Sequence, residues 1–184
     1  DMRGRKTDVI IETPAGSRIK YAWDPQANRF RAKKVLPLGM SFPFDFGFIP
    51  GTRAPDGDPL DALVVADAPL AVGAIVECRL LGVFRVAMSE KGGSKLVEND
   101  RLVAVPVDTI RGARWRDLAD LGGELLAEIG DFFQSYVERE GRRFVHRGRK
   151  KGVVIVAMPP GERHGLGVAM LTDILADAGY AVLN

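Results

Sequence analysis

Residues 56–65 read Asp56-Gly57-Asp58-Pro59-Leu60-Asp61-Ala62-Leu63-Val64-Val65, an acidic turn that runs directly into an apolar segment. Residues 60–65 have the length and composition of a buried strand, and the Asp-Gly pair before them is typical of a turn. Gly57 permits a tight backbone, and Pro59 restricts the exit from the turn. We therefore expect the aspartates of this turn to be able to point toward one place.

Asp56, Asp58 and Asp61 together suggest a cation site rather than part of a core. Magnesium and similar hard dications bind oxygen ligands in octahedral geometry and usually retain several waters. Because clustered anions repel one another, such a group costs free energy until a cation neutralises it. Taken alone, the same residues could equally form a solvated acidic turn, so both interpretations stay open at this point.

Short segments of β character lie on both sides of the acidic turn and are separated by Gly, Pro, Asn and Asp. They cover residues 9–12, 18–23, 74–81, 83–87 and 102–107, in addition to the segment 60–65. Many short strands at this spacing favour a closed barrel over an open α/β sheet. The sequence therefore predicts a mainly β fold.

The C-terminal third has a different pattern, with apolar residues three and four positions apart. This spacing predicts an amphipathic helix over residues 122–139, with Gly141 as its stop. A basic run follows at residues 142–151. We expect a barrel domain with its C-terminal helix over residues 1–145, and a basic and apolar tail of unknown role over residues 146–184.

The bulk composition is that of a globular protein, with 184 residues, 46% hydrophobic and 27% charged. No apolar stretch reaches the roughly 18 residues needed to cross a bilayer, so no membrane association is expected. Cys78 is the single cysteine and reads as a core residue, which suits a reducing compartment and predicts a cytoplasmic location. The formal net charge of +2 is too small to indicate nucleic-acid binding by itself.

Further motifs accompany the acidic turn in a consistent order. They are ETPAGSRIKY at residues 12–21, FPFDFGFIPG at 42–51, NDRLVAVP at 99–106, and the expected helix with Phe132, Phe133 and Tyr136. Together they resemble the family I soluble inorganic pyrophosphatases, whose signature D-[SGDN]-D-[PE]-hydrophobic-D fits Asp56 to Asp61 at every position. The resemblance covers about residues 9–145.

The resemblance implies a small closed β-barrel of the OB kind with flanking helices, and it implies an active site. Metal ligands would be Asp56, Asp58 and Asp61, with Asp58 also acting as the base for the attacking water. The other implied site residues are the carboxylate Glu12 and the phosphate-binding Lys20, Lys34 and Tyr136. The implied cofactor is Mg²⁺, with Mn²⁺ or another divalent metal as alternatives, and the implied assembly is a homo-oligomer, possibly a hexamer.

The implied reaction is hydrolysis of pyrophosphate to two phosphates. Pyrophosphate is highly charged, and metal ions with cationic side chains neutralise the charge that moves onto the phosphate oxygens. Bound metal also lowers the pKa of a coordinated water, whose proton a nearby aspartate then accepts.

Several positions depart from the family pattern. Ala22 replaces a glutamate, Phe46 a tyrosine, Met88 an aspartate and Val137 a lysine of typical members. These changes remove ligands and phosphate contacts, so we expect a thinned second metal site.

Partial replacements for the lost groups are also present. Asn99 and Glu90 are weak candidate metal ligands in place of the missing aspartates, and Arg101 stands for a lysine. An arginine keeps the positive charge and can bind phosphate oxygens bidentately. We expect activity that needs more magnesium than a member with all its carboxylates.

Two alternatives belong to other functional classes. The first is a pyrophosphatase-like protein that binds phosphate compounds without efficient turnover. The second is an OB-type nucleic-acid-binding protein that would use the basic run and the alternating Phe42, Phe44, Phe46 and Phe48. We regard nucleic acid as an unlikely partner, because alternate phenylalanines usually pack a barrel interior and the acidic turn repels phosphates.

Overall fold

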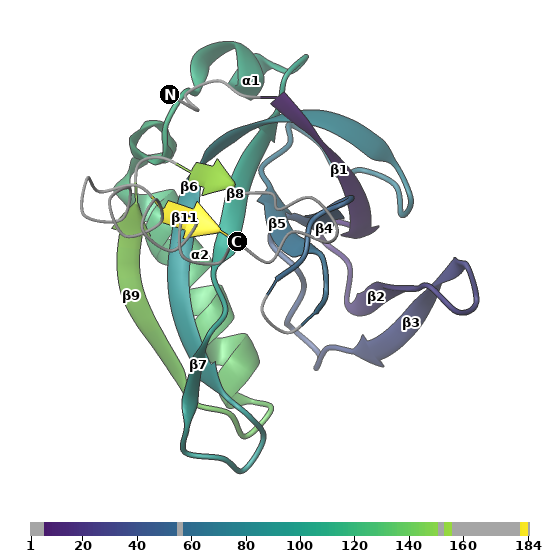
Figure 1. The fold of residues 1–184 in the computed structure, drawn as a ribbon, viewed down its shortest axis with the longest axis vertical. Helices are drawn as coiled ribbons and strands as arrows, with labels where there is room; N and C mark the ends of the chain where they lie inside the picture. The colour runs from purple at the N-terminus through teal and green to yellow at the C-terminus, as the bar shows by residue number, and fades with distance from the viewer. Residues whose placement is uncertain (1–5, 55–56, 151–152, 156–180, 184) are drawn as a thin grey trace, which may run out of the picture.

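The computed structural model describes residues 6–54, 57–150, 153–155 and 181–183 (Figure 1). Its strands are β1 (Lys6–Thr13), β2 (Ile19–Asp24), β3 (Arg29–Val35), β4 (Asp45–Ile49), β5 (Leu60–Val64), β6 (Ile75–Ser89), β7 (Leu96–Glu98), β8 (Arg101–Pro106), β9 (Phe144–Lys150), β10 (Val153–Ile155) and β11 (Ala181–Leu183). Its helices are α1 (Ile110–Arg114), the 3₁₀ turn η1 (Leu118–Leu121) and α2 (Gly122–Glu138). The expectation of a mainly β fold with flanking helices is confirmed.

The main sheet returns to its first strand. β1 pairs with β4, β4 with β5, β5 with β8, β8 with β6, and β6 again with β1, so five strands form a ring. All of these pairs are antiparallel except β5 with β8, which is parallel. The parallel pair sets the N-terminal ends of β5 and β8 side by side, at the edge where the acidic turn enters.

β6 is one long strand, where the sequence predicted two separate strands over 74–81 and 83–87. Its pairing with β8 shifts register between Leu80 and Gly82. The glycine therefore marks a bulge that bends a continuous strand, and it does not end the strand as a turn would. The bend lets β6 serve the ring with its first half and pair with β7 and β9 with its second.

The core lies on both faces of β5. Ala62 and Val64 belong to a cluster that takes residues from all five ring strands, and Leu63 belongs to a second cluster beneath η1 and α2. From Ala62 on, the strand is covered on both sides and has no solvent face, which explains the continuous apolar run after Asp61. Cys78 lies wholly buried in the first cluster, and burial raises the pKa of its thiol to about 12. It is therefore a core side chain, as the sequence predicted.

Helix α2 confirms the predicted amphipathic helix. Its buried residues Leu126, Ile129, Phe133 and Val137 recur every three or four positions, and the first three belong to the core cluster that includes sheet residues. The chain leaves the helix through Gly141, whose φ of 70° is the left-handed conformation common after a helix. No helix in the described part of the chain is long and apolar enough to cross a membrane.

The basic run is part of the fold. Strand β9 pairs with β6 from Val83↔Lys150 to Met88↔Phe144, so the domain boundary expected between residues 145 and 146 falls inside a strand. Past this strand, β10 and β11 form a small parallel pair. Residues 156–180, which make up most of the expected tail, lie outside the described residues.

Strands β2 and β3 form a hairpin that is a sheet of its own and projects from the ring (Figure 1). Thr13 at the end of β1 connects the two units, because its hydroxyl donates to the carbonyl of Tyr21 and accepts from the amide of Tyr21. The space between the hairpin, the ring and α2 contains the candidate site.

Candidate active site

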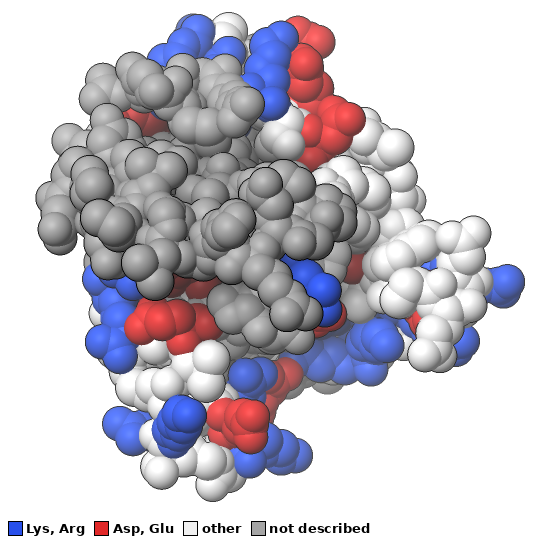
Figure 2. Space-filling view, in the orientation of Figure 1, with Lys and Arg blue, Asp and Glu red and all other residues white. Residues whose placement is uncertain are grey.

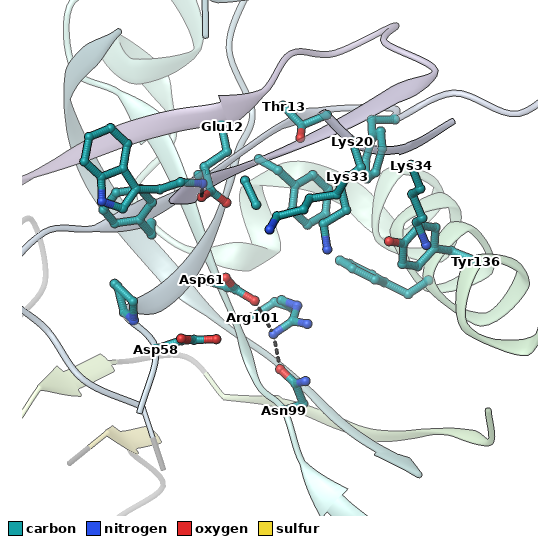
Figure 3. Close-up of a pocket in the computed structure, with 18 of the residues that line it drawn as sticks. Glu12, Thr13, Lys20, Lys33, Lys34, Asp58, Asp61, Asn99, Arg101 and Tyr136 are labelled. Carbon is teal, nitrogen blue, oxygen red and sulfur yellow. Dashed lines mark hydrogen bonds and ion pairs between the residues drawn. The ribbon is translucent and has the colours of Figure 1, made fainter. Parts of the chain in front are cut away.

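A cavity of about 780 Å³ lies where the hairpin, the ends of the ring strands and α2 face one another (Figure 3). Its charged lining residues are Glu12, Lys20, Lys33, Lys34, Asp58, Asp61, Arg101, Glu140 and Arg142. The structure thus brings together most of the residues that the sequence singled out, from segments more than a hundred positions apart. Asp56 lies outside the described residues.

Glu12 faces the acidic turn from the end of β1. Val9, Ile11 and Thr13 are buried in the core, so alternation along the strand turns Glu12 to the other side. The amide of Trp23 donates to its carboxylate at 2.7 Å. Burial, followed by the charges of Asp61 and Asp58, raises the pKa of Glu12, and the Trp23 amide and Lys20 oppose that rise.

Asp61 forms an ion pair with Arg101 at 2.7 Å. The two residues precede the cross-strand pair Ala62↔Leu102 of the parallel strands, so they are neighbours on one face of the sheet. Arg101 is only 13% exposed, whereas Asp61 is 42% exposed on the cavity side. A fixed cation therefore already compensates one carboxylate of the acidic turn.

Asn99 and Asp100 face opposite ways. Asn99 lines the cavity and accepts a hydrogen bond from the Arg101 guanidinium through its side-chain carbonyl. Asp100, in the short link between β7 and β8, instead accepts from the Val86 amide at 3.1 Å. The Asn99 oxygen proposed from sequence as a weak metal ligand is thus engaged by Arg101.

Glu90 is not among the residues that line the cavity. It lies beside a separate hollow with Lys91, Glu140 and Arg142. The reason is the length of β6, which runs on to Ser89 and carries Glu90 into the turn beyond it. The structure therefore does not bring this weak candidate ligand to the aspartates.

Lys34 and Tyr136 meet on the far wall of the cavity. The Lys34 ammonium lies 3.9 Å from the centroid of the Tyr136 ring and forms an ion pair with Glu140. Burial would lower the pKa of Lys34, but its interactions with Glu140 and Tyr136 raise it above its usual value. The ammonium of Lys20 is 6.0 Å from the same ring.

Three charged lining residues were missed by the sequence interpretation: Lys33, Glu140 and Arg142. Glu140 and Arg142 follow directly after α2, and their ion pair spans 3.5 Å. Their position between a helix and a basic run gave no local signal of a site. Lys33 stood beside Lys34, and strand alternation predicts that only one of the two can face the cavity.

An aromatic cluster closes the cavity behind the lysines. Phe42 is 2% exposed and packs against Phe46, Phe132 and Tyr136 with ring centroids 5.3 to 5.7 Å apart. A ring buried in this way cannot stack on a nucleobase. In the basic run, Arg147 forms an ion pair with Glu98 at 3.0 Å. On the face drawn in Figure 2, the basic and acidic side chains of the described residues are interspersed.

The departures from the family pattern all lie at this cavity. Ala22, Phe46, Met88, Asn99 and Val137 are among its lining residues. Each change therefore alters the cavity wall directly.

Among the described residues, no group of three or more His, Cys, Asp or Glu side chains could hold a metal ion. The described part of the acidic turn offers Asp58 and Asp61, with Glu12 facing them (Figure 3).

Comparisons with known proteins agree with one another. The family model for inorganic pyrophosphatase matches residues 9–153. The inorganic pyrophosphatase of Synechocystis sp. is 38% identical over 133 residues, which are 72% of this chain and 75% of that protein. That of Ralstonia nicotianae is 40% identical over 141 residues, or 75% of this chain and 77% of that one.

Solved structures give the same result. The inorganic pyrophosphatase of Thermus thermophilus superposes with a TM-score of 0.70 at 31% identity and covers 79% of this chain and 82% of its own. That of Neisseria gonorrhoeae superposes with a TM-score of 0.71 at 31% identity, over 81% of this chain and 84% of its own.

Proposed function

The chain belongs to the inorganic pyrophosphatase family and hydrolyses inorganic pyrophosphate to two phosphates, and we propose that the cavity between the β2–β3 hairpin and α2 is its active site. The single observation that carries this proposal is the convergence of Asp58, Asp61 and Glu12 with Lys20, Lys34 and Tyr136 around one space. Carboxylates that can hold a metal ion and ammonium groups that can bind phosphate, gathered around one space, are what a metal-bound diphosphate requires.

The family depends on a divalent metal, and we propose that Mg²⁺ is the ion used here. The available donors fit it, because Asp58 and Asp61 present only carboxylate oxygens. These two residues, with Asp56 as a third ligand expected from the sequence, would hold the ion. When bound, a divalent ion neutralises phosphate charge and lowers the pKa of a coordinated water. Mn²⁺ offers similar chemistry and is the ion to compare.

The acidic side chains of the cavity have two further roles in the reaction. Asp58, in the turn before β5, accepts the proton of the attacking water as a general base. One bridging O–P bond of the substrate breaks as the new bond forms, and the second phosphate leaves. Glu12, held by the Trp23 amide, keeps a carboxylate oriented toward the same space.

The hairpin and α2 supply side chains that bind the phosphate groups. Lys20 and Lys34 supply positive charge, and Tyr136 supplies a hydroxyl that can donate to the product phosphate. Lys34 reaches this position because Glu140 and the Tyr136 ring fix its ammonium. From the ring side of the cavity, beside Asp61, Arg101 adds a planar guanidinium that can bind phosphate oxygens in pairs.

The test is phosphate release by purified protein with pyrophosphate and Mg²⁺, measured with malachite green. We expect release that depends on the metal and is strongly reduced in Asp58→Asn. Binding of pyrophosphate without any release, at every concentration of Mg²⁺ and Mn²⁺, would instead show a binding protein and overturn the proposal.

We also propose that the protein forms a homo-oligomer in the cytoplasm, with a hexamer as the assembly to test first. Large apolar side chains lie exposed on the described surface, among them Leu38 at 87%, Ile110 at 69% and Ile75 at 68%. Their burial between copies would remove apolar area from water. A buried, unpaired Cys78 is compatible with a reducing compartment. Light scattering after size-exclusion chromatography measures the number of copies.

A further inference from the structure

Lys33 occupies an extra position in strand β3. The hairpin pairs Lys20 with Lys34 and Tyr21 with Ala32, so the register shifts and Lys33 has no partner across the strands. In a regular strand, neighbouring residues point to opposite faces. A bulge relaxes this alternation, and here both Lys33 and Lys34 line the cavity.

The lysines of the cavity are not equivalent. Lys34 is held by Glu140 and lies over the Tyr136 ring. The Lys33 side chain makes no hydrogen bond or ion pair with any residue of the described chain, and it is an exposed residue that lines the cavity. Its charge is therefore available to a ligand without first breaking an internal contact.

The lysine side chains of the cavity point in two directions. Lys20 and Lys33 extend from the hairpin into the space opposite Asp61 and Arg101, whereas Lys34 lies beside Tyr136 (Figure 3). Arg101 faces the same space from β8. An anion between the hairpin and the ring would thus have an ammonium on one side and a guanidinium on the other.

We propose that Lys33 is a phosphate-binding residue of this enzyme, and that it grips the substrate opposite Arg101. This inference rests on the proposed active site and adds a residue to it. Charge-assisted hydrogen bonds to phosphate are stronger than neutral ones, and an ammonium on a flexible stem can follow the phosphate through the reaction. Because Lys33 then binds substrate and transition state alike, it acts mainly on KM.

The test compares Lys33→Gln with Lys95→Gln, which removes the same charge from an exposed lysine outside the cavity. We expect Lys33→Gln to raise KM for pyrophosphate about tenfold, with kcat changed less than about threefold. Lys95→Gln should leave both constants unchanged, and Lys33→Arg should recover most of the lost affinity. Equal KM values for the wild type, Lys33→Gln and Lys95→Gln would overturn the proposal.

A second measurement separates this inference from the proposed function. Calorimetry with methylenediphosphonate, whose P–C–P bridge is not cleaved, reports binding without turnover. We expect its Kd to rise about tenfold in Lys33→Gln, and the difference from wild type to shrink as salt is added. If the wild type releases no phosphate yet Lys33→Gln still binds the analogue less well, the proposed function fails and the role of Lys33 stands. If the wild type hydrolyses pyrophosphate and the Kd of the analogue is the same in both, only the role of Lys33 fails.

Discussion

The guanidinium of Arg101 lies 2.7 Å from the carboxylate of Asp61, across the parallel pair of strands β5 and β8. The acidic turn therefore carries part of its counter-charge on the protein itself. A divalent ion that binds at Asp61 must compete with this guanidinium. The magnesium requirement of the enzyme should depend on the competition.

Replacing Arg101 by glutamine removes the competing cation. We expect Arg101→Gln to bind Mg²⁺ about tenfold more tightly, which corresponds to ~1.4 kcal/mol, because the Asp61 carboxylate is released. At the same time KM for pyrophosphate should rise, since a phosphate contact is lost. Titration of metal by calorimetry measures the first effect without turnover. Arg31→Gln is the control, because Arg31 pairs with Asp24 outside the cavity; unchanged metal affinity in Arg101→Gln would refute the competition.

Asp58→Asn tests the general base. Asparagine keeps the size of the side chain but cannot accept the proton of water, so kcat should fall by a factor on the order of 10² to 10⁴. The melting temperature without metal should change little, because Asp58 is exposed at a turn. Steady-state kinetics at saturating Mg²⁺ measure this loss of kcat. A kcat within tenfold of wild type would show that Asp58 is not the general base.

Met88→Asp restores a carboxylate at the cavity wall. Met88 is only 6% exposed, so an unpaired carboxylate there should cost about 2 kcal/mol in the absence of metal. Added Mg²⁺ should recover that loss and should lower the metal concentration needed for activity. Melting temperatures measured with EDTA and with Mg²⁺ show the difference. In the control Met88→Leu, which offers no metal ligand, the melting temperature should gain no new dependence on metal. A Met88→Asp protein that melts alike in both buffers would argue against metal binding at this wall.

The Lys34–Glu140 pair predicts how stability changes with pH. Burial would raise the pKa of Glu140, but the hydrogen bond and charge of Lys34, with Arg142, lower it below the usual value. A lowered carboxyl pKa adds stability that is present above the unfolded pKa of about 4.3 and is lost as pH falls through the folded pKa. The difference in free energy of unfolding between wild type and Glu140→Gln should therefore be largest near neutral pH and vanish in acid. Denaturant titrations from pH 7 to pH 3 measure it, and a difference that grows toward pH 3 would contradict the pairing.

Helices and strands whose apolar residues follow a regular pattern could be predicted from the sequence. The apolar face of α2 and the apolar residues of β5 are patterns among residues that are close together in the chain. Both elements lie where these patterns predicted them. The single strand β6 was missed because Gly82 reads as a break when its partner β8 is unknown. A glycine has the same local appearance in a bulge and in a turn.

Partners of charged side chains could not be predicted in the same way. The sequence indicated Arg101 as a phosphate ligand, but its ion pair with Asp61 depends on the register of two strands some forty residues apart. The contacts of Asp45 could not be predicted from the sequence either. Asp45 is 1% exposed and accepts from the amides of Ala15 and Leu70, so it ties two loops to β4, and burial raises its pKa. Nothing in its neighbourhood along the chain indicates either contact.

The separate sheet of the β2–β3 hairpin has a consequence for how the enzyme can change. Among the described lining residues, Lys20, Lys33 and Lys34 are all carried by this hairpin, whereas Glu12, Asp61 and Arg101 are carried by the ring. Substitutions on these two short strands can therefore change the lysines that bind phosphate, while the site residues of the ring stay fixed by the packed interior. In such an architecture, substrate preference and structural integrity can evolve on different segments of one chain.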